Sequence, residues 1–383
     1  MKTKRDSKHQ EIFAELQRAI GSGQYKEGDR LPSEVELVGR FGASRPTIAR
    51  ALQRLVQEGI VERRPGSGTY VRGRNPDEHY IFGLLIPELG QTEIFEPICQ
   101  GLSGASQGKN HQLLWGNTTG ALPKEKQAEE LCRQYVKRRV SGVFFAPLEL
   151  FAGKDEVNRR IATALDEASI PIVLLDRDLC QFPERSKYHL VGIDNYRAGY
   201  RITEHLLKLG CRRIVFLAHP YSAPTVRARE AGWREVMQKY QAAADPEFVR
   251  NADPADVSTV REILHSVRPE AFVCANDLTA ATLMQTLNSL GVTIPTEVRI
   301  VGMDDVKYAK LLHVPLTTVH QPCQEIGFAA LTAMLGRIMY PTLPAWDVLL
   351  EAPLVIRQSC GSDLGLARPS VAEVEVEQAT ADV

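Results

Sequence analysis

The stretch Phe41–Gly59, FGASRPTIARALQRLVQEG, has the pattern of an amphipathic helix with a defined start and end. Its apolar residues from Ile48 to Val56 recur at the i, i+3, i+4, i+7 and i+8 spacing of a single buried face. Ser44 suits the N-cap, and Gly59 suits the position just past the last turn. The rest of this helix carries the residues that we expect to meet a polar partner, namely Arg45, Pro46, Thr47, Arg50 and Arg54.

The segments on either side predict two further helices and a hairpin. Apolar residues from Ile12 to Ile20 mark a first helix, and LPSEVELVGRFG gives a second, in which Ser33 and Glu36 have capping-box spacing. After the opening stretch, GIVERRPGSGTYVRG has two short β-type runs around a Pro-Gly-Ser-Gly turn. Three helices followed by a two-stranded wing predict a winged helix-turn-helix over residues 1–72.

Charge is distributed unevenly along the chain. The whole chain of 383 residues has a formal net charge of −1. Residues 1–74 contain 15 Lys or Arg and 9 Asp or Glu, giving 15 − 9 = +6, so the remainder carries −1 − 6 = −7. A basic segment on a mildly acidic remainder predicts a polyanionic partner for the first segment alone.

Double-stranded DNA is the polyanion that this arrangement suits. A recognition helix enters the major groove, and the residues of its first turn meet base edges. Arg45 suits guanine or a phosphate, and Thr47 suits a phosphate or a thymine methyl group. In the wing, Arg63 and Arg64 suit the DNA backbone or minor groove, and Gly66 permits a close backbone approach. A solvated basic face is the alternative interpretation of the same pattern.

The composition excludes several classes of protein. With 44% hydrophobic and 24% charged residues, the chain is typical of a soluble globular protein of two or three domains. No apolar run approaches the roughly 20 residues of a membrane span, and no apolar segment follows the basic N-terminus. We therefore expect a cytoplasmic bacterial protein, associated with the nucleoid when it binds DNA. Seven scattered cysteines without CxxC, and nine histidines without HExxH, predict no metal site and no cofactor.

From Ile81 onward, short apolar runs alternate with amphipathic stretches, among them IFGLLIP, GVFFAP, IPIVLLD, RIVFLA, AFVCAND and RIVGMDD. This alternation predicts α/β architecture with parallel sheets that helices cover on both faces. About ten strands are more than one small sheet holds, so we expect two doubly wound subdomains with a cleft between them. We also expect a linker at residues 73–80 and an acidic disordered tail at 361–383.

The run LPSEVELVGRFGASRPTIARALQRLVQEGIVERRPGSGTYV resembles the GntR-type winged-helix domain, and the match covers nearly all of residues 9–72. The resemblance implies dimeric DNA binding, with contacts at Arg45, Thr47 and Gly66. Val35 is a departure, because the family often has arginine between the two glutamates of this helix. One DNA contact of the family is therefore expected to be missing, which leaves the operator sequence open.

The remainder differs from the usual partners of that domain. VGIDNYRAGYRITEHLLKLGCRRIVFLA, RAREAGW, FVCANDLTA and VRIVGMDDVKYAKLLHVPLTTVHQP together resemble the LacI/GalR-type effector domain, which is similar to periplasmic sugar-binding proteins. The resemblance covers residues 81–360. It implies a type I periplasmic-binding-protein-like fold, with one subdomain at about 81–189 and 321–342 and the other at about 190–320 and 343–360. The whole chain is thus similar to arabinose-responsive repressors of this hybrid kind.

Polar residues at the carboxyl ends of the predicted strands mark the cleft of such a domain. Carboxylates, amides and guanidiniums bind adjacent sugar hydroxyls in pairs, and an aromatic face covers the apolar side of the ring. With the resemblance, the candidate effector-binding residues are Phe95, Glu149, Asp176, Arg229, Asn276, Asp304 and Gln321. Ala146 stands where related sugar binders often have a polar residue. Either Glu149 reaches the cleft in its place, or the ligand lacks a hydroxyl on that side.

Several of these candidates have a structural alternative. Asp176, Asn276 and Asp304 suit the caps of the helices or turns that follow them. Phe95 suits a plain core position, and Arg229 suits a surface position.

The leading interpretation is a ligand-responsive transcriptional regulator, a repressor of carbohydrate-utilisation genes that a sugar releases from its operator. Its expected partners are double-stranded operator DNA, a small-molecule effector and a second copy of the chain. A nucleobase or nucleoside effector is the alternative within this class. A small-molecule binding protein of transport or chemotaxis type is the alternative outside it. No motif assigns a catalytic nucleophile or acid, so we do not expect an enzyme.

Overall fold

The computed structural model describes residues 4–26, 28–57, 60–71, 79–86, 93–106, 111–116 and 123–364. The chain divides into two compact units, which are described separately. The first contains Met1–Ile81 together with Ser106–Gln112 and Thr332–Pro344, and the second contains the rest of the chain.

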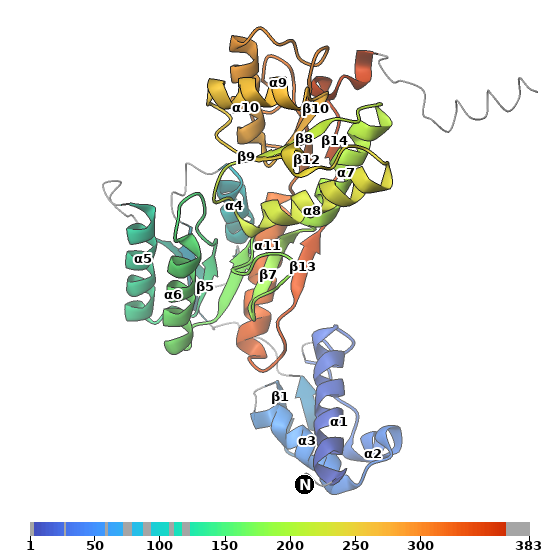
Figure 1. Ribbon diagram of the computed structural model, residues 1–383. Coiled ribbons are helices and arrows are strands. Elements are labelled where there is room, and N and C mark those ends of the chain that lie inside the picture. The colour runs from blue at the N-terminus through green and yellow to red at the C-terminus, as the bar shows by residue number, and fades with distance from the viewer. Residues whose placement is uncertain are drawn as a thin grey trace, which may run out of the picture. The chain divides into compact units, whose positions relative to one another are not determined.

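The first unit contains a three-helix domain with a two-stranded wing, drawn in blue in Figure 1. Its elements are α1 (Lys4–Gly21), α2 (Glu34–Phe41), α3 (Arg45–Gln57), β1 (Val61–Arg64) and β2 (Gly68–Val71). The two strands pair antiparallel, with Val61 opposite Val71. Leu16, Leu37, Ile48 and Leu55 from the three helices are fully buried together. The predicted winged helix-turn-helix is confirmed, because each helix places its apolar stripe in one core.

The capping box predicted from the sequence fixes the start of α2. The Ser33 side chain accepts from the Glu36 backbone N–H, and the Glu36 side chain accepts from the Ser33 backbone N–H at 2.6 Å. Gly42 ends the helix in the left-handed region, with φ of 55°. The turn between α2 and α3 is therefore defined by local sequence signals.

Two six-stranded sheets, each built from βαβ connections, account for the other strands, and except for the first residues of β3 and β4 these strands belong to the second unit (Figure 1). The first sheet has the order β13-β7-β6-β5-β3-β4. Its strands are β3 (Tyr80–Leu85), β4 (His111–Trp115), β5 (Gly142–Phe145), β6 (Ile172–Leu175), β7 (His189–Ile193) and β13 (Asp347–Leu350), and the helices between them are α4 (Phe95–Ser106), α5 (Lys124–Arg138) and α6 (Lys154–Glu167). The pairs from β13 through β3 are parallel.

The second sheet has the order β14-β12-β11-β10-β8-β9, and all its pairs are parallel except β12 with β14. Its strands are β8 (Ile214–Ala218), β9 (Val249–Asn251), β10 (Ala271–Cys274), β11 (Arg299–Asp304), β12 (Thr317–His320) and β14 (Leu354–Val355), and its helices are α7 (Asn195–Lys208), α8 (Pro224–Lys239), α9 (Val257–Ser266) and α10 (Asp277–Ser289). α11 (Cys323–Met339) follows β12, and short 3₁₀ helices lie at Pro246–Phe248, Gln358–Cys360 and Ser362–Leu364. Every residue of β5, β6, β8 and β10 is buried, as expected for central parallel strands.

The two predicted doubly wound subdomains are confirmed, but their predicted boundaries are wrong at two places. The boundaries expected near residues 190 and 343 would assign β7 and β13 to the second sheet. Instead, β7 pairs with β6 and β13 pairs with β7, both in the first sheet. The chain therefore changes sheet three times, after Ile193, between β12 and β13, and between β13 and β14. An apolar run predicts a strand, but its length and composition do not say which of two sheets accepts it.

The predicted linker and tail fall mostly outside the described residues. Residues 72–78 of the linker region are not described, and Tyr80 already belongs to β3. In the predicted tail, Ser362–Leu364 forms a 3₁₀ helix, and residues 365–383 lie outside the description.

Glycines allow two pairs of helices to approach closely. A Cβ on Gly199 of α7 would lie 2.1 Å from the backbone oxygen of Arg229, and a Cβ on Gly232 of α8 would lie 2.1 Å from that of Tyr196. α4 and α11 have the same arrangement at Gly101 and Gly327. The contact between α7 and α8 therefore has no room for a side chain at these positions, and it helps to fix Arg229 on α8.

Replacing Gly232 by alanine is expected to lower the free energy of unfolding by about 1–3 kcal/mol. The added methyl group would collide with the backbone of α7 at Tyr196, which can give way only if the two helices move apart. Gly104→Ala in α4 is the matched control. No atom lies within 4 Å of its added Cβ, so the higher helix propensity of alanine should leave stability equal or greater. Urea unfolding measures both variants. Equal stability of G232A and the wild type would contradict the close approach.

Candidate nucleic-acid interface and effector site

A groove of about 620 Å³ lies on the winged-helix unit between the start of α2, the start of α3 and the wing. Arg30, Arg45, Arg63 and Arg64 line it. The Arg45 side chain, at the first residue of α3, is 72% exposed. Four guanidiniums around one groove give it the charge and the donors to bind phosphates and base edges.

The wing contributes backbone to the same groove. Gly66 has φ of 75°, and no atom lies within 4 Å of the position its Cβ would take. The positive φ is the physical reason for glycine at the tip of this turn. Val35 also lines the groove and is 67% exposed, so the position that departs from the family's arginine is an accessible one.

The remaining predicted DNA contacts on α3 differ in their surroundings. Pro46 and Arg50 are exposed, and no carboxylate among the described residues pairs with Arg50. The Thr47 hydroxyl lies 2.8 Å from the Ser44 hydroxyl at the start of the helix. Arg54 is different, because its guanidinium lies 4.1 Å from the ring centroid of Phe13 in α1. The prediction that Arg54 faces DNA is therefore not supported, since this side chain packs on the neighbouring helix.

Four predicted effector residues of the second unit lie in one buried cluster. Asp176 follows β6 and Asp304 ends β11, both with positive φ. Arg229 donates from Nε to Asn195 Oδ1 at 2.8 Å, and its Nη2 lies 3.6 Å from Asp304 Oδ1. Gln321 Nε2 donates to Asp176 Oδ1 at 2.7 Å. Strands of both sheets thus bring these polar groups together, as expected at the carboxyl ends of parallel strands.

Arg177 belongs to this cluster and was not predicted. Its guanidinium pairs with Glu149, and its Nε lies 3.4 Å from Asp176 Oδ2. Glu149 Oε2 also accepts from the Ala223 backbone N–H at the start of α8, at 3.0 Å. Burial alone would raise the pKa of Glu149, but Arg177 holds it below the ordinary value. The signal that could have identified Arg177 is its place directly after Asp176, at the end of a buried strand.

Phe95 and Asn276, two of the predicted effector residues, have the structural roles that the sequence offered as alternatives, a core position and a helix cap. Phe95 is 2% exposed, and the Arg177 guanidinium lies 5.1 Å from its ring centroid, so the aromatic face is already covered. Asn276 is the N-cap of α10, where its Oδ1 accepts from Thr279 N at 2.8 Å. The helix cap thus uses the side-chain oxygen of Asn276, and the Arg177 guanidinium lies on the ring of Phe95.

The cluster contains buried polar atoms whose hydrogen-bonding capacity is unused. Gln321 Oε1 and Arg177 Nε are both buried, and neither makes a hydrogen bond within the part of the chain that the structure describes. Gln321 Oε1 is an acceptor, and leaving it without a donor costs free energy. Arg177 Nε is a donor that has Asp176 Oδ2 beside it at 3.4 Å as an ion pair but makes no hydrogen bond to it. A ligand that both donates and accepts would satisfy them.

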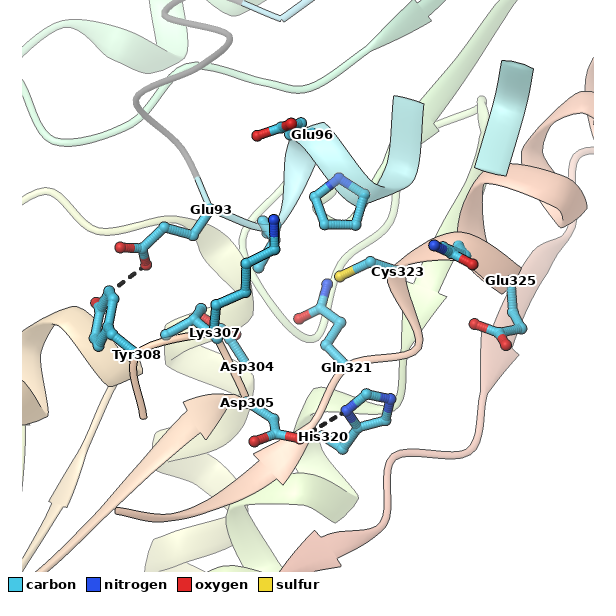
Figure 2. Close-up of a pocket in the computed structure, with 14 residues that line it drawn as sticks. Glu93, Glu96, Asp304, Asp305, Lys307, Tyr308, His320, Gln321, Cys323 and Glu325 are labelled. Atoms are coloured by element: carbon cyan, nitrogen blue, oxygen red, sulfur yellow. Dashed lines mark hydrogen bonds and ion pairs between the residues drawn. The ribbon is translucent and has the colours of Figure 1, made fainter. Parts of the chain in front are cut away.

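A cavity of about 610 Å³ adjoins this cluster at Asp304 and Gln321. Figure 2 shows two side-chain pairs on its wall. Tyr308 donates its hydroxyl to Glu93 Oε2 at 3.1 Å, and His320 Nδ1 lies 3.0 Å from Asp305 Oδ2. The other charged lining residues are Glu96, Lys307 and Glu325.

Charge in the cavity is predominantly acidic. Five carboxylates line it, against one lysine and one histidine. Burial raises the pKa of Asp304 well above its ordinary value, although Arg229 opposes the shift. The cavity therefore suits polar uncharged groups better than it suits an anion.

The described residues contain neither a candidate metal site nor a candidate membrane span. No group of three or more His, Cys, Asp or Glu side chains there is arranged to hold a metal ion. None of the described helices is both long enough and apolar enough to cross a membrane.

A basic winged helix joined to a two-sheet α/β unit with a polar cleft defines the class of ligand-responsive transcriptional regulators. Residues 8–71 match the bacterial regulatory proteins of the gntR family, and residues 203–360 match the periplasmic binding protein-like domain. The chain combines these two domains and is a DNA-binding transcriptional regulator.

The chain is similar to known transcriptional regulators along most of its length. The chain is 28% identical to the arabinose metabolism transcriptional repressor of Geobacillus stearothermophilus, over 94% of this chain and 99% of that protein. It is 24% identical to the ribose operon repressor of Escherichia coli K12, over 82% of this chain and 92% of that protein. The transcriptional regulator CelR in complex with cellobiose aligns with a TM-score of 0.61 at 25% identity, covering 82% of this chain and 90% of that structure.

Proposed function

We propose that this protein is a transcriptional repressor whose operator binding is weakened when an uncharged sugar binds in the cleft of the α/β unit. The observation that carries the proposal is that the buried cluster contains an acceptor, Gln321 Oε1, and a donor, Arg177 Nε, neither of which makes a hydrogen bond within the described residues. A hydroxyl group both donates and accepts, so one or two adjacent sugar hydroxyls satisfy an acceptor and a donor together. The names of the two similar repressors, for arabinose and ribose, support this ligand class.

A nucleobase effector receives less support. Recognition of a planar base commonly uses an aromatic face for stacking. The sequence suggested Phe95 for the apolar side of a sugar ring, and the Arg177 guanidinium lies 5.1 Å from its ring centroid, so this ring is not an open stacking face for a base either. The cluster instead presents charged and amide groups, which suit hydroxyls.

Two chains of this regulator would bind one operator. A helix-turn-helix dimer places two recognition helices on half-sites one helical turn of DNA apart, or a multiple of that spacing. The DNA contacts we propose are Arg45, Thr47, Arg50, Arg63 and Arg64, with the Gly66 backbone. Sugar binding between the subdomains would change the population of conformations that fit this spacing.

Thermal-shift titration with pentoses, hexoses, cellobiose, their phosphates and nucleobases is the first test. An uncharged sugar is expected to stabilise the α/β unit by about 2.7 kcal/mol at 100 times its Kd. The phosphorylated form of the same sugar should bind at least about tenfold more weakly, because five carboxylates line the cavity beside one lysine and one histidine. Operator DNA selected from a random library then serves in a gel-shift assay with the same sugar.

Three outcomes would contradict the proposal. Tighter binding of the phosphate than of the free sugar would contradict the acidic cavity as the ligand site. A thermal shift with nucleobases alone would contradict a sugar as the effector. If no sugar in the panel changes DNA binding, release of the operator by a sugar is contradicted.

A further inference from the structure

Glu34 lies between two arginines of the DNA-binding groove. As the first residue of α2, its carboxylate contacts Arg45 Nε through Oε2 at 3.4 Å and pairs with Arg63 Nη2 through Oε1. Its side chain is 20% exposed, whereas those of Arg45 and Arg63 are 72% and 58% exposed. One carboxylate thus links the start of α2, the start of α3 and the first strand of the wing.

The contact leaves particular atoms of Arg45 available. Glu34 accepts a hydrogen bond only from the Nε of Arg45, and this guanidinium makes no other hydrogen bond within the described residues. Both terminal nitrogens stay free, and these are the atoms that pair with O6 and N7 of a guanine. A guanidinium held at Nε has a fixed plane, so its free edge has a fixed direction.

Stability does not explain this arrangement. Ion pairs between exposed side chains contribute little to folding, because solvent screens them and both side chains lose freedom. The carboxylate does, however, occupy the place that a DNA phosphate takes beside an arginine pair. A phosphate that enters the groove must displace Glu34 or stay close to its negative charge.

We infer that Glu34 is a positioning residue that sets the sequence specificity of DNA binding. It holds Arg45 and Arg63 away from indiscriminate phosphate contacts and directs the free edge of Arg45 toward base edges. Non-specific binding then loses two cationic contacts, while specific binding gains a preorganised donor pair. The inference rests on the proposed DNA binding by the winged helix. Measuring the affinity of the wild type for duplex DNA tests that assumption separately.

The test compares the full-length wild type with Glu34→Gln by fluorescence anisotropy. One probe is a random-sequence duplex, measured over a series of salt concentrations, and the other is a duplex selected from a random library by the wild type. E34Q is expected to bind the random duplex more tightly, with a slope of log K against log salt steeper by about 1–2, since each added phosphate contact contributes about 0.9. The ratio of specific to non-specific affinity should fall about tenfold.

Glu15→Gln is the matched control. It removes the same charge from the same domain and breaks the Arg40–Glu15 ion pair of 3.1 Å, whose residues do not line the groove. It should leave the salt slope and the affinity ratio close to those of the wild type. Glu34→Asp keeps the charge but withdraws the carboxylate, so it should keep weak non-specific binding and lose specific affinity.

The inference is overturned if E34Q and E15Q change both quantities equally. It is also overturned if E34Q melts like the wild type yet loses binding to both duplexes, because Glu34 would then be a DNA contact itself.

Discussion

Replacing Arg229 by alanine is expected to abolish the response to the effector and to lower the free energy of unfolding of the α/β unit by about 3–5 kcal/mol. Arg229 is 4% exposed, donates to Asn195 and to the Ala275 backbone oxygen, and lies beside Asp304. Its removal leaves the Asp304 carboxylate buried without its cationic neighbour. The effector then loses the guanidinium and meets a carboxyl group whose pKa, already raised by burial, rises further.

Two measurements separate the effects on stability and on binding. Urea unfolding reports the loss of stability, and calorimetric titration of the sugar identified by thermal shift reports the loss of binding, expected to exceed 100-fold. Asp304→Asn is nearly isosteric and removes a buried charge, so it should lose sugar affinity with a smaller effect on folding. DNA binding should persist in both variants, because the groove lies on the winged-helix unit.

Arg227→Ala is the matched control, two residues earlier on α8 and exposed. It should change neither stability nor sugar affinity by more than about 0.5 kcal/mol. Wild-type sugar affinity in R229A or in D304N would mean that the effector binds elsewhere.

The parts of the site that the sequence predicted are those that depend on local order along the chain. Asp176 and Asp304 each end an apolar strand run, and the carboxyl ends of parallel strands lie at one edge of a sheet. Ser33 and Glu36 likewise form a capping box because both partners lie within one turn. In these cases the interacting groups are close in sequence, or the strand end alone fixes their position.

The parts that could not be predicted depend on which element becomes the neighbour. Arg54 lies on the polar side of its own helix, but only the position of α1 brings Phe13 beneath its guanidinium. Phe95 follows the first strand of the α/β unit, yet whether its ring stays open depends on Arg177, which lies more than eighty positions further on. The position of Glu34 within its own helix does not indicate its role, because its partners belong to α3 and β1. Periodicity describes one element at a time and carries no information on these contacts.

The second large effect is a dependence of stability on pH that arises from Asp277. This residue begins α10, has no exposed surface, and accepts from the Thr318 hydroxyl at 2.6 Å and from the Val306 backbone N–H at 3.0 Å. Burial raises its pKa to about 7, although both hydrogen bonds oppose the shift. In the unfolded chain its pKa returns to about 4.

The sign of the effect follows from the protons bound in each state. Between about pH 4 and pH 7 the folded protein holds a proton on Asp277 and the unfolded chain does not, so stability falls as pH rises. The stabilisation is complete below about pH 4 and is lost once pH passes the folded pKa. From pH 5 to pH 8 the loss from this group alone is about 3 kcal/mol.

Asp277→Asn mimics the protonated side chain and should make the pH profile of the unfolding free energy shallower by that amount. The comparison uses urea unfolding of both proteins at several pH values between 5 and 8. Asp256→Asn is the control, because Asp256 is an exposed N-cap of α9 and its serine and threonine hydrogen bonds lower its pKa to about 2. Its titration is complete well below pH 5, so its profile should run parallel to that of the wild type. A D277N profile that also runs parallel would mean that Asp277 is ionised in the folded protein throughout this range, with Thr318 and Val306 outweighing the cost of its burial.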